Sequence, residues 1–268
     1  ACPTGALMPS NDAGLNIPDK KVDSVCPYCG VGCLLTYNVK NNKILFTDGR
    51  DGPSNLSRLC VKGRYGFDYI TNEGRLTKPL IRKNGVSKNI DVSSFDFNKL
   101  SDIFEETTWD IALTKTTQGF KNIKNKKGPN ALAGFGCAKG SNEEAYLFQK
   151  LIRTGFNTNN VDHCTRLCHA SSVVALLEMI GSGAVSNQVA DVTEADVIIV
   201  IGSNPTVNHP VAATFMKNAA KDGKTLIVMD PKKVELARHA NYYLQFKPDT
   251  DVALINAIMK SIIDQNLV

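Results

Sequence analysis

The sequence predicts an α/β fold in which a small, β-rich, cysteine-bearing domain precedes a larger region built around a parallel sheet. Two observations support this prediction. Short stretches of alternating apolar and polar residues, broken at Asn41-Asn42, follow the first cysteines and are typical of a hairpin. In the last third of the chain, continuous apolar runs such as Val197–Ile201 alternate with helical segments, which is typical of a parallel sheet covered on both faces.

Local patterns predict the individual elements in order. Thr108 and Asn142 each precede a run with helical periodicity, so each is expected to be the N-cap of a helix. Strands are expected at 34–39, 43–46, 131–135, 197–201, 225–229 and 242–246. Further helices are expected at 210–221, at 232–239 and from Thr250 or Asp251 onward.

Composition and charge exclude several classes of protein. Of the 268 residues, 43% are hydrophobic and 21% are charged, an ordinary mixture for globular domains. The net charge of +5 is dispersed and no basic patch interleaves with aromatic residues, so nucleic acid is not an expected partner. No apolar run approaches the roughly 18 residues that a membrane span needs. The chain opens on Ala1-Cys2-Pro3 without a targeting signal, and we expect its natural N-terminus to lie further upstream.

Four of the eight cysteines have the spacing of a metal-cluster motif. Cys26, Cys29 and Cys33 lie close together, and Cys60 follows 27 positions later. Soft thiolates bind zinc or iron–sulfur clusters. Zinc sites usually pair two C-x2-C halves, whereas three clustered cysteines and a distant fourth are common for 4Fe–4S clusters. The spacing therefore favours an iron–sulfur cluster over a zinc ribbon.

A second cysteine site lies at Asp162-His-Cys-Thr-Arg-Leu-Cys-His169. Cys168 is expected at or near a helix N-terminus, where the helix dipole and free amide groups stabilise a thiolate, and His169 can accept a proton near neutral pH. Plain packing is one alternative. A cysteine hydrolase with His163 or His169 as base is another, disfavoured because adjacent residues rarely have the required mutual geometry. Cys137 and Cys164 are expected to be structural.

The last third also contains the elements of a site for a phosphate-bearing ligand. Gly202 follows the strand at 197–201 and leads into a helix, an arrangement that binds anions. Asp230 ends the next strand, where an acidic group can contact a ribose or a base. The glycine-rich fingerprint of NAD-binding proteins does not match. An ordinary capped helix is the plainer alternative.

Three motifs in this order resemble the molybdopterin oxidoreductase superfamily. Cys26-Pro-Tyr-Cys-Gly-Val-Gly-Cys33 with Leu59-Cys-Val-Lys-Gly-Arg64 is similar to its N-terminal 4Fe–4S motif, in which the lysine matching Lys62 lies between cluster and pterin. Residues 160–172 are similar to the active-site segment of formate dehydrogenases, where the position of Cys168 ligates molybdenum or tungsten and a histidine matching His169 follows. Related nitrate reductases usually carry methionine after the cysteine, which favours the formate branch.

The resemblance covers about residues 22–268 and implies cofactors and a reaction. The implied cofactors are a 4Fe–4S cluster on the four clustered cysteines and a molybdenum or tungsten bis-molybdopterin guanine dinucleotide. The implied reaction is oxidation of formate to CO2, with His169 orienting the substrate or handling the proton and electrons passing Lys62 toward the cluster. The implied dinucleotide contacts are Gly202, Asn204, Asp230, Lys232, Lys247, Asp249 and Asp251. Family members often have an acidic residue where Val207 stands, and this chain departs from them there.

The resemblance also divides the chain into four parts. Residues 1–21 are expected to be a linker and the end of a ferredoxin-like module, because Cys2-Pro3 resembles the end of a bacterial ferredoxin motif. Residues 22–78 are expected to form the cluster domain, 79–163 an incomplete α/β domain, and 164–268 an incomplete Rossmann-like domain for the dinucleotide. Family members are considerably longer, so we expect this piece alone to be inactive. We expect a cytoplasmic setting, with ferredoxin-like domains upstream and an NAD- or flavin-linked electron-transfer subunit as partner.

Three alternatives to formate oxidation stay open on the sequence. A nitrate or other oxyanion reductase of the same superfamily shares the fold but usually differs at the position of His169. A degenerate electron-transfer subunit keeps the fold and the iron but binds no molybdenum, tungsten or pterin. A zinc-ribbon binding module holds a colourless metal in place of the cluster.

Overall fold

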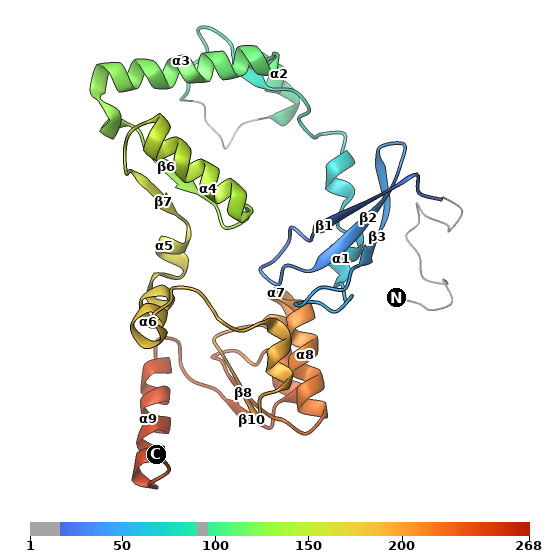
Figure 1. Ribbon diagram of the computed structural model, residues 1–268, viewed down its shortest axis with the longest axis vertical. Helices are drawn as coiled ribbons and strands as arrows, with labels where there is room; N and C mark the ends of the chain where they lie inside the picture. The colour runs from blue at the N-terminus through green and yellow to red at the C-terminus, as the bar shows by residue number, and fades with distance from the viewer. Residues whose placement is uncertain (1–16, 90–95) are drawn as a thin grey trace. The chain divides into compact units, whose positions relative to one another are not determined.

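The cysteine-bearing N-terminal domain is a three-stranded antiparallel sheet followed by short helices. The computed structural model describes residues 17–89 and 96–268, so the predicted ferredoxin-like end around Cys2 lies outside the described residues. Strands β1 (Lys20–Val25), β2 (Leu34–Lys40) and β3 (Lys43–Gly49) pair in the order β1-β2-β3 (Figure 1). Helix α1 (Val61–Tyr65) and the 3-10 helix η1 (Asp68–Thr71) follow them.

The hairpin between β2 and β3 forms where the sequence predicts it. Asn41 and Asn42 have φ angles of 49° and 59°. Two-residue hairpin turns need such left-handed values to match the twist of the strands, and asparagine tolerates them. The predicted hairpin is therefore confirmed.

A second sheet, late in the chain, is parallel, as predicted. Strands β8 (Val197–Ile201), β9 (Thr225–Met229) and β10 (Tyr242–Leu244) pair in the order β10-β9-β8. Ala219 and Leu236, from the two helical connections, pack in one buried core with Ile198 and Leu226 of the sheet. The helices of this region are η6 (Val189–Thr193), α7 (Pro205–Asn208), α8 (Pro210–Lys221), η7 (Glu235–His239) and α9 (Asp251–Asp264).

At β8, the described residues bury only one face of this sheet, whereas the sequence predicts that both faces of the sheet are buried. Ile198 and Val200 are buried, but Val197, Ile199 and Ile201 are 53%, 58% and 36% exposed. A continuous apolar run indicates that both faces of a strand suit burial, but it does not say which residues cover them. The prediction of two covered faces is therefore wrong for the described part of the chain.

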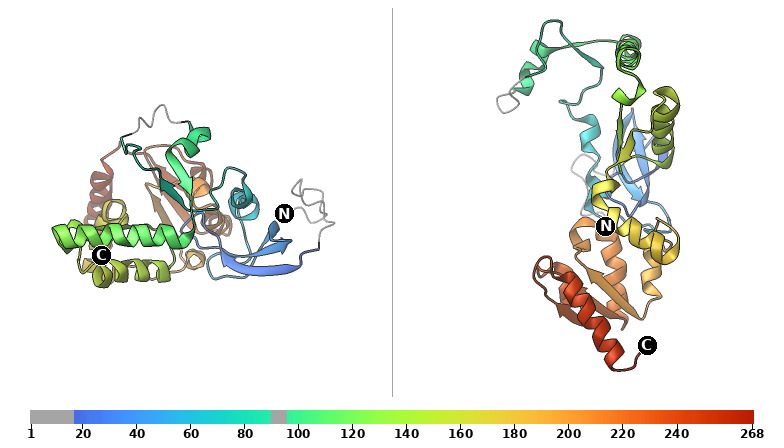
Figure 2. Two further views of the ribbon diagram at one scale, coloured as in Figure 1. Left: turned by 90° about the horizontal axis from the view of Figure 1, so that it is seen from above. Right: turned by 90° about the vertical axis from the view of Figure 1, so that its left-hand side faces the viewer.

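The middle of the chain, residues 73–185, forms a unit of its own, and the described residues before and after it form the other. Its strands are short: β4 (Leu80–Arg82) pairs antiparallel with β5 (Phe104–Glu106), and β6 (Gly134–Gly136) pairs parallel with β7 (Val161–His163). The longest helix, α3, is seen lengthwise in the left view of Figure 2 and end-on in the right view. The helices are η3 (Phe97–Lys99), α2 (Leu100–Ile103), α3 (Trp109–Lys127), η4 (Pro129–Ala131), α4 (Asn142–Lys150), the π-helical turn η5 (Leu151–Gly155), α5 (Thr165–Cys168) and α6 (Ala170–Ile180).

One predicted helix cap of this unit is confirmed and the other is wrong. Thr108 caps α3, and its hydroxyl accepts from Ile111 N at 3.4 Å. Helix α4 is capped by Ser141 and not by Asn142. Ser141 Oγ accepts from Glu144 N at 3.3 Å, and the Glu144 carboxylate accepts from Ser141 N at 2.6 Å. This reciprocal pair satisfies two free amide groups at once, which a cap on Asn142 does not.

Other element boundaries also differ from the prediction. The strand expected at 131–135 is the 3-10 helix η4 followed by β6, the helix expected at 232–239 is the 3-10 helix η7, and the strand expected at 242–246 ends at Leu244. Thr250 precedes α9, but its hydroxyl donates to Lys247 O at 2.7 Å and does not cap the helix. No helix within residues 17–89 and 96–268 is long and apolar enough to cross a bilayer.

Gly49 ends β3 at a point where the loop toward Cys60 passes very close to it. A Cβ atom added there would lie 2.0 Å from Ser57 O, a backbone atom that cannot move without shifting the loop. We expect Gly49→Ala to lower the free energy of unfolding by about 1–3 kcal/mol, measured by urea denaturation. The control is Gly119→Ala in α3, where an added Cβ meets nothing within 4 Å. It should raise that free energy by about 0.5–1 kcal/mol. Equal losses in both variants would contradict the steric explanation.

Candidate functional site

Three of the four motif cysteines lie on the loop between β1 and β2. Cys26 N donates to Cys33 O at 2.8 Å, which closes the base of the loop, and Gly32 N donates to Cys29 O at 3.3 Å. Gly32 has a φ of 66°, a left-handed conformation that glycine adopts without a steric penalty. The fourth cysteine, Cys60, is the N-cap residue of α1.

These four thiols are close enough to affect one another electrostatically. Burial, followed by the charges of the other three cysteines, raises the pKa of the Cys33 thiol to about 12. Cys26 and Cys33 are buried, and Cys29 and Cys60 are half-buried. A group of partly buried thiolates is unfavourable unless cations neutralise it. The group therefore fits the iron of a 4Fe–4S cluster.

The residues that the structure describes form no tight single-ion site. Within 17–89 and 96–268, no three His, Cys, Asp or Glu side chains gather closely enough to hold one metal ion. In a 4Fe–4S cluster each thiolate binds a different iron, so its four ligands stand further apart than the ligands of a zinc ion. Ligation by these four cysteines stays a prediction.

A buried amide joins the loop before Cys60 to the end of the three-cysteine loop. Asn55 is 0% exposed and accepts from Leu34 N at 3.1 Å. Its side-chain nitrogen donates to Leu34 O and Arg58 O at 3.1 and 3.0 Å. Leu34 directly follows Cys33, and Arg58 precedes Cys60 by two residues. Asn55 therefore ties the fourth cysteine to the first three.

Helix α8 packs against the cysteine group although it is distant in sequence. Val211, Ala212 and Phe215 of α8 share one buried core with Cys26 and Cys33. The candidate cluster site is therefore made jointly by the N-terminal domain and the parallel-sheet region.

Tyr28 ties helix α1, which carries Lys62, to the cysteine loop. The Tyr28 hydroxyl donates to Gly66 O, and Gly66 N donates to Lys62 O at 2.8 Å. Burial, then the charges of Tyr69, Asp68 and Cys26, raises the pKa of Tyr28, so the hydroxyl keeps its proton as a donor. The Lys62 side chain is exposed and can reach a ligand outside the cluster domain.

Cys168 and His169 lie where two helices of the middle unit meet. Cys168 is the last residue of α5, and His169 is the N-cap residue of α6. The predicted position of Cys168 near a helix N-terminus is therefore confirmed. Both side chains are exposed, so the thiol and the imidazole are open to a bound metal and a substrate.

Cys137 and Cys164 are also exposed, and the expectation that they are structural stays a prediction. Neither packs into a core. Cys164 Sγ lies 3.8 Å from His163 Nδ1, which also accepts from Thr165 N at 3.1 Å. Because Nδ1 is an acceptor, the ring proton of neutral His163 lies on Nε2.

A hollow of about 820 Å³ lies at the ends of β6 and β7, and the sequence prediction missed it. Asp162, His163 and Arg166, which directly precede Cys168, line one side. The His163 amide, then the Arg166 guanidinium at 3.0 Å, holds the pKa of Asp162 below its usual value. The signal was present in the sequence. A strand, a glycine turn and a capped helix follow one another over 134–142, the same order as over 197–210.

The predicted dinucleotide residues follow the carboxyl ends of the parallel strands. Gly202 directly follows β8, and its N donates to Met229 O, at the end of β9, at 2.9 Å. Asp230 directly follows β9, and its N donates to Leu244 O, the last residue of β10, at 3.3 Å. Gly202 and Asp230 therefore lie at one edge of the sheet, the edge at which α/β proteins bind ligands.

Several of these side chains already have local partners. Asp230 is 8% exposed, and its Oδ1 accepts from Lys232 N at 2.8 Å. Asn204 is the N-cap residue of α7, and its Oδ1 accepts from Thr206 Oγ1 at 2.8 Å. The remaining predicted contacts follow β10 and are exposed: Lys247, Asp249 and Asp251.

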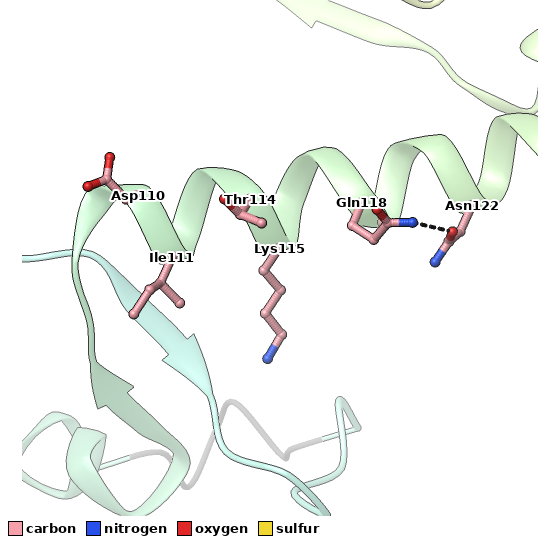
Figure 3. A pocket seen from close by; sticks show the side chains of 7 residues that line it. Asp110, Ile111, Thr114, Lys115, Gln118 and Asn122 are labelled. Atoms are coloured by element: carbon pink, nitrogen blue, oxygen red, sulfur yellow. Dashed lines mark hydrogen bonds between the residues drawn. The ribbon is translucent and has the colours of Figure 1, made fainter.

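A further hollow, of about 640 Å³, lies along helix α3 (Figure 3). Gln118 Nε2 donates to Asn122 Oδ1 at 2.8 Å on its wall. All of its lining residues belong to this one helix, and no predicted site residue is among them. We therefore assign it no role in the candidate site.

In protein freed of iron, Cys33 should be the least reactive of the described cysteines toward iodoacetamide near neutral pH. Its pKa of about 12 keeps the thiolate fraction small, whereas Cys137, Cys164 and Cys168 are exposed. Because the pKa of Cys33 in the folded protein lies above the ordinary thiol pKa of about 9, the stability contributed by Cys33 is complete below pH 9 and is lost as the pH rises toward 12. Peptide mass spectrometry after timed alkylation measures the order of reaction. Modification of Cys33 before the exposed thiols would contradict the buried arrangement.

Two protein-family models match adjacent parts of the chain. The model described as molybdopterin oxidoreductase Fe4S4 domain matches residues 19–72, and the model described as molybdopterin oxidoreductase matches residues 75–268. Together they confirm the predicted pair of cofactors, a 4Fe–4S cluster and a molybdopterin-bound molybdenum.

The chain is similar to longer proteins. It is 38% identical over 249 residues to the F420-dependent formate dehydrogenase 2 subunit alpha of Methanococcus maripaludis, covering 92% of this chain and 34% of that protein. It is 40% identical over 250 residues to a provisionally named formate dehydrogenase of Staphylococcus aureus, covering 92% of this chain and 24% of that protein. Acetylene hydratase from Pelobacter acetylenicus shares the fold, with a TM-score of 0.72 at 22% identity over 92% of this chain and 32% of that one. The chain thus spans about a quarter to a third of these proteins, and it belongs to the molybdopterin oxidoreductase family.

Proposed function

We propose that this chain is part of a formate dehydrogenase catalytic subunit, carrying a 4Fe–4S cluster and the cysteine that ligates the active-site metal. The pairing of Cys168 with His169 at the start of α6 carries the proposal. Relatives named as formate dehydrogenases, at 38% and 40% identity, support it. The fold alone cannot choose the reaction, because acetylene hydratase shares it.

The residues present fit a molybdopterin guanine dinucleotide. Cys168 offers an exposed sulfur, the kind of ligand that soft metals prefer. Gly202 has a φ of 58° and would meet nothing within 4 Å if it carried a Cβ, so backbone at the sheet edge is open to a phosphate. We assign the dinucleotide contacts to Gly202, Asn204, Asp230 and Lys232, and to Lys247, Asp249 and Asp251 after β10.

The proposed reaction converts formate into CO2, one proton and two electrons. A metal held by Cys168 would supply two-electron redox chemistry, and a cluster held by Cys26, Cys29, Cys33 and Cys60 would supply one-electron transfer. Cys168 holds the metal in place. His169 is next to that ligand and exposed, so its imidazole can orient the formate carboxylate or hold the released proton.

Lys62 is proposed to lie on the electron path between pterin and cluster. It is in the first turn of α1, two residues after Cys60, and its exposed ammonium group can hydrogen-bond to a pterin. The tie from Tyr28 to Gly66 keeps α1 against the cysteine loop. The side chain thus extends from a fixed point beside the cluster.

The proposed electron acceptor is an NAD- or flavin-linked subunit reached through ferredoxin-like domains, in a cytoplasmic enzyme. The Methanococcus relative is named for a different acceptor, F420. The acceptor is therefore assayed separately from formate oxidation, with NAD, F420 and an artificial viologen as alternatives.

Cys168→Ala should abolish formate-dependent viologen reduction by the complete polypeptide that carries these residues, purified without oxygen. The reason is loss of the protein ligand to the metal. Iron should be unchanged, because the cluster cysteines are untouched. Cys164→Ala is the matched control, an exposed cysteine four positions earlier, and should keep the activity.

The outcomes separate the alternatives. If the protein holds its full content of molybdenum or tungsten but reduces nitrate and does not oxidise formate, its substrate is an oxyanion and not formate. Iron without molybdenum, tungsten or pterin would indicate a degenerate electron-transfer subunit. Zinc without iron would indicate a zinc-binding module.

Lys62→Ala should slow reoxidation of the metal centre through the cluster by about tenfold or more while metal and iron contents stay unchanged. The expected cause is the loss of one charged hydrogen bond, from the Lys62 ammonium group to the pterin, that links the pterin to the cluster domain. Rapid-mixing spectroscopy of cluster reduction after formate addition measures the rate. Lys43→Ala, an exposed lysine at the hairpin end, is the control. An unchanged rate in Lys62→Ala would remove Lys62 from the path.

A further inference from the structure

Arg58 connects the loop before Cys60 to helix α8 by stacking on an aromatic ring. Its guanidinium carbon lies 4.3 Å from the centroid of the Phe215 ring. Cation–π contacts of this kind are favourable and require the charge to stay over the ring face. The carbonyl of Arg58 is also held by Asn55 at 3.0 Å, so both its backbone and its side chain are fixed.

This guanidinium has a buried N–H without an acceptor. Arg58 Nη1 is buried and donates to no atom among the residues that the structure describes. Leaving a buried donor unpaired lowers the stability of the folded protein, and more so for a charged group. The stacking contact offsets that cost only in part, so stability alone does not account for an arginine at this position.

The positive charge of Arg58 is also not balanced by a carboxylate. No ion pair joins it to another residue of 17–89 or 96–268, whereas Arg50, in the same loop, pairs with Asp23 at 2.8 Å. The ring beneath Arg58 belongs to the buried core that includes Cys26 and Cys33. Arg58 thus holds an uncompensated charge two residues before Cys60, stacked on a ring of the core that contains Cys26 and Cys33, where partly apolar surroundings screen it less than water does.

We propose that Arg58 sets the reduction potential of the 4Fe–4S cluster. The inference rests on the proposed ligation of that cluster by the four cysteines. Reduction adds one electron to the cluster and makes it more negative, so a fixed positive charge nearby stabilises the reduced form and raises the potential. Net charge, hydrogen bonds to sulfur and burial are the factors by which proteins tune such clusters. Phe215 positions the guanidinium, so a residue of the parallel-sheet region acts on a cluster held by the N-terminal domain.

The test compares Arg58→Met, Arg58→Lys and wild type in the complete polypeptide loaded with its cofactors. Spectroelectrochemical titration, followed by electron paramagnetic resonance of the reduced cluster, gives the midpoint potential of each. We expect a more negative potential in Arg58→Met and a value closer to wild type in Arg58→Lys, which keeps the charge but loses the planar stacking group. Lys43→Met removes an exposed lysine of the same domain and should leave the potential unchanged.

A second variant tests the role of the ring. Phe215→Leu keeps the core apolar but removes the face on which the guanidinium stacks, and should shift the potential in the same direction as Arg58→Met. An unchanged potential in Arg58→Met, or equal shifts in Arg58→Met and Arg58→Lys, would overturn the charge effect. Iron content and the cluster spectrum are recorded in every variant. If the wild-type protein holds no cluster, the proposed function itself is contradicted.

Discussion

The group of four thiols at the base of the N-terminal sheet is the constraint on which much of the described site depends. Each thiol alone is ordinary, but in this group burial, followed by the charges of the other three cysteines, raises the pKa of Cys33 to about 12. Iron bound by these four cysteines would remove this conflict, because it neutralises the thiolates. The surrounding structure then has one task, to bring Cys60 from a distant loop to the other three. Asn55 does this with a side chain that has no exposed surface.

The same constraint explains why the N-terminal domain and the parallel-sheet region form one unit. A three-stranded sheet is too small to bury the cysteine group by itself, since its strands have few residues facing a core. Helix α8 supplies the missing apolar surface through Val211, Ala212 and Phe215. Cofactor chemistry and folding are therefore connected, because the helix that supports the proposed dinucleotide sheet also covers the proposed cluster.

The sequence predicts those parts of the structure that depend on local chemistry. Asn41-Asn42 indicates the hairpin because few residues accept left-handed backbone, and the runs at Val197–Ile201 and Thr225–Met229 indicate parallel strands because they are apolar throughout. Local rules fail where two candidates compete for the N-cap position, as at Ser141 and Asn142, where the partner Glu144 decides.

Local rules also fail where tertiary packing decides. The exposure of Cys137 and Cys164 and the hollow beside His163 depend on contacts that a linear pattern does not contain. The metal-ligating and dinucleotide roles rest on motifs, and the geometry adds to them only the proximity of the cysteines and the shared edge of Gly202 and Asp230.

The start of helix α1 has a consequence for the lifetime of the protein. Cys60 occupies the N-cap position, but its side chain makes no capping hydrogen bond, and the helix has only five residues. Such a short helix has little stability of its own. If Cys60 binds iron, the cluster takes the place of the missing cap at the N-terminal end of the helix, whereas Tyr28 holds the other end through Gly66. Loss of the cluster would then free only the N-terminal end of the helix, and the chain around Cys60 would become more accessible to proteases.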